Sequence, residues 1–391
     1  NFDARNFYHK WIHDIIDAQI VESGYVPNGA PWQPGCGGGV AWGAAISIMP
    51  WEFYMHYGSK DILEDSFEPM KRYIGYMKNW VDEEGIMHHQ RVGRDGEVLK
   101  WFNLGEWVAP GELPPDELVH TFYFWQCAEI TAKTAAILGN TKDERLYTEL
   151  AEETRKAFQK RFYNPETGSY GDAGANIFAL KMGIPDEQYS KVIAAVKANI
   201  KKNKGHLDTG IFGTRFFFEI LSENGLHQKA YEAIIKTDEP GYGRWLELGA
   251  TTTREKWSQD GSHNHPMFGG GLSWLYKNLA GMRVDPEKPG YRHLIFKPQP
   301  VSDLSYVVYK NQTVYGMAGI HWKQNNNSFE MDIDVPVGAD ATVYVPSIEG
   351  DTVLESGKPV SGSDAVKFQK YANGYKIYQV KSGNYRFTVH E

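Results

Sequence analysis

The sequence contains almost no cysteine. Cys36 and Cys127 are the only two in 391 residues, and they stand far apart. This usage excludes a disulfide scaffold and a thiolate metal site. No apolar run approaches the ~20 residues that a membrane-spanning helix needs, so we expect no membrane partner. The chain starts Asn1-Phe-Asp-Ala-Arg5, which is neither an initiator methionine nor a signal peptide, so we expect it to be a piece of a longer protein.

The chain also lacks an excess of positive charge. Its net charge is −8, with acidic and basic residues interspersed, which excludes the cationic surface that binds nucleic acid. Aromatic residues are abundant, at 14% of the chain with 12 Trp and 23 Tyr. Aromatic rings mostly fill protein cores, but they also stack on the apolar faces of sugar rings, and a carbohydrate partner fits this composition.

Apolar residues recur at helical spacing in the first 283 residues. Early examples are Phe7, Trp11 and Ile15, and then Met70, Ile74 and Met77. Further helices fit residues 46–53, 117–139, 142–162, 186–203, 207–224, 227–237 and 268–281. Short connections make such helices antiparallel neighbours. About ten helices are one pair short of a closed ring of six pairs, so we predict an (α/α)6 toroid, incomplete at its N-terminus, over residues 1–283.

The pattern changes to period two after Val284. Alternating segments occupy residues 304–309, 319–322, 329–335, 341–345, 376–380 and 385–389, and Pro286, Pro289, Pro298 and Pro300 precede them as a linker. At least six short strands separated by turn residues are typical of a sandwich. We therefore predict a C-terminal antiparallel β-sandwich over residues 284–391.

One segment has a composition that neither period explains. It runs Gly249-Ala-Thr-Thr-Thr-Arg-Glu-Lys-Trp257, and Ser262-His-Asn-His-Pro-Met-Phe-Gly269 follows. A lone carboxylate at Glu255, close to Trp257, is a candidate general base because partial burial can bring its pKa toward neutrality. The alternative is a surface glutamate paired with Arg254 or Lys256.

Two histidines follow Glu255 at short range. His265 is a candidate for a hydrogen bond to a sugar hydroxyl or to the base, and a purely structural histidine is the alternative. His263 and His265, or His88 and His89, form pairs that metals use, but no third ligand stands at a recognisable spacing. We therefore predict neither a metal nor a cofactor.

Two further segments are candidates for substrate binding. Leu104-Gly-Glu-Trp-Val-Ala-Pro110 presents Glu106 and Trp107 together in a loop before a helix, although an acidic residue near the positive end of a helix dipole explains it equally well. Gly37-Gly-Gly-Val-Ala-Trp-Gly-Ala-Ala45 carries Trp42, and Trp51 follows. The glycine run lacks the lysine of a phosphate-binding loop, which excludes a nucleotide site of that type.

Taken in order, these segments resemble one family. Ala41-Trp-Gly-Ala-Ala45, Leu104–Pro110, His206-Leu-Asp-Thr-Gly-Ile-Phe-Gly213, Gly249–Trp257 and Pro289-Gly-Tyr-Arg-His-Leu294 are similar to the bacterial α-L-rhamnosidases of glycoside hydrolase family 78. The resemblance runs over essentially the whole chain. It implies an (α/α)6 barrel followed by a β-sandwich, and hydrolysis of terminal α-L-rhamnose with inversion, which uses one carboxylic acid and one carboxylate base.

The resemblance also implies roles for individual residues. Glu255 takes the place of the general base and His265 that of a sugar-contacting histidine, while Trp107 and Trp51 match aromatic residues of the rhamnose pocket. Glu106 stands where the family usually has aspartate. We extend the predicted binding set to Trp42, His263 and Trp257.

The sequence departs from the family in three places. The family's general acid lies in an Asp-Cys-Pro-x-Arg-Glu segment, which this chain does not contain. Ala44 stands where the family usually has aspartate, and Arg254 replaces a usual tryptophan beside the base. An arginine there adds a fixed cation where the family has an aromatic face.

Three functional hypotheses follow, because a likeness of fold does not fix the reaction. The first is an α-L-rhamnosidase acting on oligo- or polysaccharides with terminal rhamnose, joined to upstream β domains and located in the periplasm or outside the cell. The second is a polysaccharide lyase that cleaves rhamnose from glucuronate by β-elimination, in which Arg254 neutralises the uronate and a catalytic histidine such as His265, or Glu255, abstracts the C5 proton. The third is a non-catalytic rhamnose-binding protein.

Overall fold

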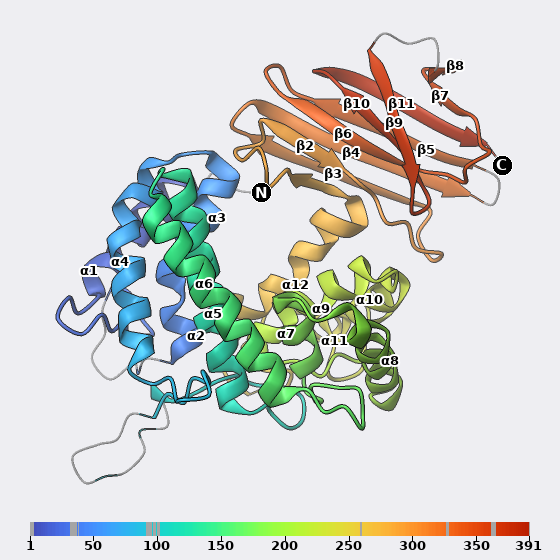
Figure 1. Cartoon of the computed structure of the whole chain (residues 1–391). Coiled ribbons are helices and arrows are strands. Elements are labelled where there is room, and N and C mark those ends of the chain that lie inside the picture. Colours follow the sequence, from blue (N-terminus) through green and yellow to red (C-terminus); the bar gives the residue numbers. More distant parts are fainter. Residues whose placement is uncertain are drawn as a thin grey trace.

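The computed structural model describes residues 4–31, 37, 39–90, 96, 99, 102–258, 260–325, 328–360 and 365–390. Figure 1 shows an arc of helices, from α1 to α12, followed by two β-sheets that lie to one side of it. The helical and sandwich regions therefore follow each other along the chain, as the sequence predicts.

Most of the helices form hairpins, each pairing a helix of an inner layer with one of an outer layer. The inner helices are α3 (Ala45–Tyr57), α5 (Asp116–Ile137), α7 (Ala175–Met182), α9 (Ile211–Glu223) and α12 (Gly269–Trp274), and the outer helices are α1 (Arg5–Ala18), α4 (Asp61–Lys78), α6 (Thr141–Phe162), α8 (Asp186–Lys202) and α10 (His227–Ile234). The hairpin of α5 and α6 explains the two layers. Helix α6 buries one stripe, formed by Tyr147, Ala151, Thr154 and Phe158, whereas α5 buries residues all round its circumference. A single apolar stripe is typical of an outer helix and all-round burial of an inner one.

The inner helices follow one another in space in chain order. Helix α3 packs on α5, α5 on α7, α7 on α9, and α9 on α12, whereas no extensive packing between α12 and α3 closes the ring among the described residues. The prediction of an (α/α)6-type array that lacks part of its ring is confirmed.

Several short helices complete this part. They are α2 (Val40–Gly43), α11 (Tyr242–Glu247), η2 (Pro266–Phe268) and η3 (Leu275–Ala280). The sequence pattern did not predict α2 or α11, because four to six residues are too few to display a helical period. It did not predict α7 either, in which six of the eight residues are buried. No described helix is both long and apolar enough to cross a membrane. Cys127 is a free, buried thiol in α5, and Cys36 lies outside the described residues.

Eleven strands in the described residues form the two sheets of the sandwich. The strands are β1 (Met282–Val284), β2 (His293–Phe296), β3 (Tyr306–Thr313), β4 (Gly316–Asn325), β5 (Ser328–Val335), β6 (Asp340–Pro346), β7 (Val353–Glu355), β8 (Lys358–Pro359), β9 (Val366–Ala372), β10 (Tyr375–Val380) and β11 (Gly383–His390). One sheet has the order β1-β2-β6-β10-β9 and the other β3-β4-β5-β11-β7-β8. Buried and partly exposed residues alternate strictly along β5, as expected of a strand with one face on the core.

One pair of strands departs from the predicted antiparallel arrangement. Strand β2 runs parallel to β6, with His293 opposite Asp340 and Phe296 opposite Val343. All other pairs of the described strands are antiparallel. Strand β1 precedes the predicted linker and β2 lies within it, and both belong to the sandwich, so the change from helix to strand falls between Ala280 and Met282.

The helical array and the sandwich are joined by direct contacts. The backbone N–H of Gly290 donates to the carbonyl of Met55 over 2.8 Å. An added Cβ at Gly290 would lie 3.0 Å from the Cα of Gly58, so this approach favours glycine. On the other side, the buried indole of Trp322 donates to the carbonyl of Leu279 over 3.1 Å. These bonds fix the sandwich to the ends of α3 and η3.

Candidate active site

Most of the predicted site residues lie in the connections at one end of the helical array. Trp42 lies in the short helix α2 before α3, Glu106 and Trp107 precede α5, and the segment 249–268 precedes α12. Each loop leads from an outer helix into the next inner helix. Because the helices of each hairpin are antiparallel, these loops share the end at which the inner helices begin.

Glu106 is fully buried, at 0% exposure. One carboxylate oxygen accepts the backbone N–H groups of Trp107 (2.9 Å) and Phe212 (3.0 Å), and the other accepts that of Gly213 (2.8 Å). Phe212 and Gly213 are the second and third residues of α9, where backbone donors have no partner within the helix. An added Cβ at Gly210 would lie 2.5 Å from Cδ of Glu106, so only glycine admits the carboxyl group here.

This environment sets both the charge and the role of Glu106. Burial raises the pKa of its carboxyl to about 7, although the three backbone donors lower it. A side chain with no exposed surface does not contact a sugar. The predicted role in substrate binding is therefore corrected: Glu106 anchors the loop before α5 to the start of α9, which is the structural alternative drawn from the sequence.

Trp107 and Trp42 both reach the start of α9. The carbonyl of Trp107 accepts the N–H of Ile211 over 3.0 Å, and the ring of Trp42 meets that of Phe212 edge to face at 4.8 Å. Phe212 in turn meets Tyr123 of α5 at 5.3 Å. Both tryptophans are partly exposed, so both remain candidates for contact with a ligand.

Trp51 lies elsewhere. Its ring lies 6.0 Å from Nζ of Lys133 on α5. Lys133 comes ten residues after Tyr123, the residue of α5 that contacts Phe212, and therefore lies about 15 Å further along the axis of α5. The structure does not bring Trp51 together with Trp42 and Trp107, and the predicted role of Trp51 in the same pocket has no support in the geometry.

The segment that contains Glu255 folds back on itself. The N–H of Glu255 donates to the carbonyl of Ser262 (2.9 Å), and that of His265 donates to the carbonyl of Thr253 (2.8 Å). The Thr253 hydroxyl also donates to the carbonyl of His265 over 2.7 Å. These cross-connections hold the two predicted motifs, 249–257 and 262–269, side by side.

The carboxylate of Glu255 is partly exposed and lightly held. Within hydrogen-bonding distance it accepts the backbone N–H of Ser262 at 3.0 Å. No ion pair between described residues involves it, because Lys256 pairs with Asp260 at 2.9 Å instead. The structural alternative of a glutamate paired with its neighbours is therefore absent, and Glu255 offers an accessible carboxylate.

The two histidines of the loop do not bond to this carboxylate. Nε2 of His265 faces Sδ of Met267 at 2.7 Å, and His265 is partly exposed. His263 is exposed, and its carbonyl accepts the hydroxyl of Thr252 at 2.5 Å. Both remain candidates for contact with a ligand, but the expected bond from His265 to Glu255 is not formed.

Arg254 is only 8% exposed. Its Nε has no hydrogen-bond partner, and no carboxylate of the described residues pairs with the guanidinium. A buried cation without a partner is costly. A nearly buried guanidinium also presents little surface to a substrate, which weakens the predicted role of Arg254 in neutralising a uronate.

Trp257 belongs to the core rather than to a sugar-binding surface. It is 5% exposed and stacks on Trp245, with centroids 4.4 Å apart and an interplanar angle of 15°. Phe268 packs on it as well, also at 4.4 Å. Its neighbours cover the indole, so the predicted contact with substrate is corrected to a packing role.

The structure also reveals a polar pair that sequence reasoning missed. The guanidinium of Arg215 on α9 donates to the carboxylate of Glu52 on α3 over 2.6 Å. Burial opposes ionisation of Glu52, but Arg215, Lys277 and His56 together lower its pKa. Glu52 and His56 line a cavity of about 330 Å³. The two partners are 163 residues apart in sequence, so no local pattern could have found them.

The histidines that suggested metal binding have other partners. Nε2 of His88 bonds to Asp82 over 2.8 Å, and Nε2 of His89 bonds to the hydroxyl of Tyr76 over 2.7 Å. Across the described ranges, no group of three or more His, Cys, Asp or Glu residues is arranged to hold a metal ion.

Comparison with known proteins adds to this geometry. Residues 1–279 match the bacterial α-L-rhamnosidase six-hairpin glycosidase domain, and residues 281–359 match the bacterial α-L-rhamnosidase C-terminal domain. An α-L-rhamnosidase of Streptomyces avermitilis is 28% identical over 99% of this chain and 36% of its own length. One from Alteromonas sp. is 26% identical over 88% of this chain and 39% of its own length.

Solved structures give the same result. The α-L-rhamnosidase from Dictyoglumus thermophilum superposes with a TM-score of 0.88 at 31% identity, over 100% of this chain and 44% of that one. The Streptomyces avermitilis enzyme, solved with L-rhamnose, has a TM-score of 0.87 at 27% identity, over 99% of this chain and 36% of that one. The chain thus spans less than half the length of these relatives. By its match over residues 1–279, it belongs to the bacterial α-L-rhamnosidase family.

Proposed function

We propose that this protein hydrolyses terminal α-L-rhamnose from plant-type oligo- or polysaccharides, with inversion at the anomeric carbon and with Glu255 as the general base. The relatives with which it shares a family are named α-L-rhamnosidases. The observation that carries the proposal is the carboxylate of Glu255, which is partly exposed and forms no ion pair with another described residue. A general base needs such a carboxylate within reach of water and substrate.

The proposal assigns binding roles to residues at the same end of the array. Trp42 and Trp107 offer partly exposed rings beside the start of α9, and His263 and His265 lie in the loop of the base. Inverting hydrolysis also needs a carboxylic acid on the other side of the bond, about 6.5–9.5 Å from the base. Glu106 does not fit this role because it is fully buried, and we assign the acid to none of the described residues.

Two assays on one sample test the reaction type. The first follows release of the chromophore from an aryl α-L-rhamnoside, with the anomer of the freed rhamnose recorded by NMR in the first minutes. Hydrolysis with inversion gives the β-anomer first. The second follows ultraviolet absorbance during incubation with a rhamnosyl-glucuronate disaccharide, because β-elimination creates an unsaturated uronate.

The outcomes separate the three hypotheses. Chromophore release with the β-anomer formed first supports the proposal, and an initial α-anomer contradicts inversion. A rise in ultraviolet absorbance without aryl cleavage identifies a lyase instead. If rhamnose binds but neither product forms, the protein is a binding protein and the proposal is wrong.

A further inference from the structure

A second concave region lies where the sandwich meets the helical array, away from the loops that carry Glu255. It is a groove of about 580 Å³, a volume within the range of small-molecule sites. Its walls come from the turn between α3 and α4, the β1–β2 loop, the β5–β6 turn and the residue after β10. We call this region the junction groove.

Positive charge dominates the junction groove. Four cationic side chains line it, those of Lys60, Lys288, Arg292 and Lys381, against two carboxylates. The local balance is opposite in sign to the net charge of the chain, which is −8. By contrast, a cavity of about 470 Å³ beside α8 has Glu112, Asp172 and Asp208 against only two lysines. The positive balance of the junction groove is therefore not shared by that cavity.

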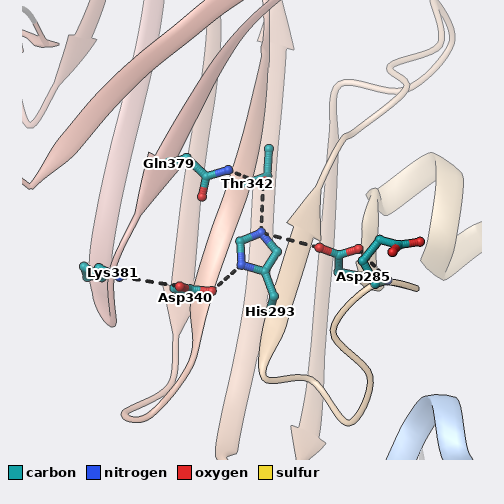
Figure 2. A network of polar contacts seen from close by, with 7 residues as sticks. Asp285, His293, Asp340, Thr342, Gln379 and Lys381 are labelled. Carbon is teal, nitrogen blue, oxygen red and sulfur yellow. Dashed lines mark hydrogen bonds and ion pairs between the residues drawn. The ribbon is translucent and has the colours of Figure 1, made fainter. Parts of the chain in front are cut away.

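One of the two carboxylates is already held by the protein. Nδ1 of the buried His293 bonds to Asp340, and Lys381 lies 3.5 Å from the other oxygen of the same carboxylate (Figure 2). On its other side, Nε2 of His293 faces the hydroxyl of Thr342 at 2.8 Å. Burial opposes ionisation of Asp340, but His293, Lys288 and Lys381 outweigh it and lower the pKa of the carboxyl.

The remaining cations have no such partner. No ion pair between described residues involves Lys60, Lys288 or Arg292, and all three side chains are exposed. Glu287 is the second carboxylate of the groove. Three cations without a paired carboxylate thus face one shared hollow, whereas solvated surface lysines point outward singly.

The segments that present these cations are ordered by their own hydrogen bonds. Asp285 organises the turn. Its side chain accepts the backbone N–H of Glu287 and its carbonyl accepts the backbone N–H of Lys288, and both hydrogen bonds are 3.0 Å long. The N–H of Asp340 donates to the carbonyl of Arg292 over 3.2 Å. Binding at such a site loses little conformational entropy of the backbone, because the loop is held before a ligand arrives.

We propose that the junction groove binds the carboxylate groups of an acidic oligosaccharide, that is, a chain of uronic acid residues. Its four cations come from three segments, namely the α3–α4 turn, the β1–β2 loop and the residue after β10, so together they suit a ligand whose charges are distributed along several sugar units. A single small anion would meet only one or two of them. The inference goes beyond the rhamnosidase proposal and does not require turnover.

Calorimetric titration of the protein with tri-galacturonate tests the site, with maltotriose as the neutral control and sodium sulfate as the small-anion control. The double variant Lys288→Ala/Arg292→Ala removes two unpaired cations, and Lys60→Glu reverses a third. Lys367→Ala, which removes an exposed lysine of β9 outside the groove, is the matched control. Melting temperatures check that each variant folds.

We expect tri-galacturonate to bind and maltotriose not to bind. Affinity should fall about tenfold or more in the double variant, from the loss of two charge contacts, and should remain within about twofold in Lys367→Ala. Raising the salt concentration should also weaken binding. The proposal is overturned if the uronate does not bind, if sulfate binds equally well, or if the double variant and Lys60→Glu both retain full affinity. Loss of rhamnosidase activity alone would leave this result unchanged.

Discussion

Glu106 and Glu255 lie in loops at the same end of the helical array, yet their carboxyl groups are held in opposite ways. Glu106 is fully buried and accepts three backbone N–H groups. Glu255 is partly exposed and accepts one backbone N–H group. Sequence motifs alone ranked both as functional. Exposure and the number of fixed donors separate a carboxylate that holds the fold together from one that is available to a substrate.

Replacing Glu255 tests this contrast with the largest expected effect. We predict that Glu255→Gln lowers kcat by about a thousandfold, because general-base catalysis contributes 10²–10⁴-fold. The free energy of unfolding should change by no more than about 0.5 kcal/mol. Hydrolysis of an aryl rhamnoside and urea denaturation provide the two measurements.

Glu247→Gln is the matched control for this variant. Glu247 is exposed at the end of α11 and close in sequence to the loop that contains Glu255. The Glu247→Gln variant should retain the wild-type activity within about twofold. The contrast fails if Glu255→Gln destabilises the protein and leaves kcat intact.

The pH dependence of stability tests the other half of the contrast. The folded pKa of Glu106 is about 7, above the ordinary value of 4.5. Between these values the folded protein retains a proton that the unfolded chain has lost, so this group makes the free energy of unfolding fall as pH rises. The full effect between pH 4.5 and 7 is about 3 kcal/mol. Denaturation of the wild type and of Glu106→Gln across this pH range gives two curves of the free energy of unfolding against pH. The change in their separation measures the effect of Glu106.

The amide in Glu106→Gln does not titrate. The difference in the free energy of unfolding between the wild type and this variant should therefore shrink toward higher pH. Glu112→Gln, in the exposed part of the same loop, should retain the wild-type curve. Parallel curves for the wild type and Glu106→Gln would show that the buried carboxyl does not titrate in this range.

Arg254 extends the contrast to a cation. The carboxylate of Glu106 accepts three backbone N–H groups, whereas the buried guanidinium of Arg254 pairs with no carboxylate of the described residues and has an unsatisfied Nε. We predict that Arg254→Met raises the free energy of unfolding by about 1–3 kcal/mol, because an apolar side chain of similar length avoids the cost of burying a charge. Arg292→Met, at an exposed position, should lie within about 0.5 kcal/mol of the wild type. A loss of stability in Arg254→Met would show that the guanidinium is well accommodated.

The sequence predicted those elements whose burial leaves a regular pattern. Helix α6 was expected at 142–162 and occupies Thr141–Phe162, because its single stripe of buried residues has a clear helical period. Helix α7 was missed because its eight residues are almost all buried and show no polar face. Strand β2 was missed for the same reason, with four residues that are nearly all buried.

The surroundings of the candidate site residues were predicted with less success, because burial depends on distant segments. Glu106 is enclosed by α9, which begins about a hundred residues later in the chain, and Trp257 is covered by Trp245 and Phe268. Neither fact is visible in a local motif. The folded loop around Glu255 was the better prediction, since both of its halves lie within one continuous segment.

The junction between the helices and the sandwich has a consequence for how the protein comes apart. The bond from Gly290 to Met55 and that from Trp322 to Leu279 lie within the packed interior at two separate points. The helical array and the sandwich therefore cannot separate without exposing apolar surface on both. We therefore expect a single cooperative heat-capacity peak on thermal unfolding, with equal calorimetric and van't Hoff enthalpies. Two resolved peaks would mean that each unit melts independently.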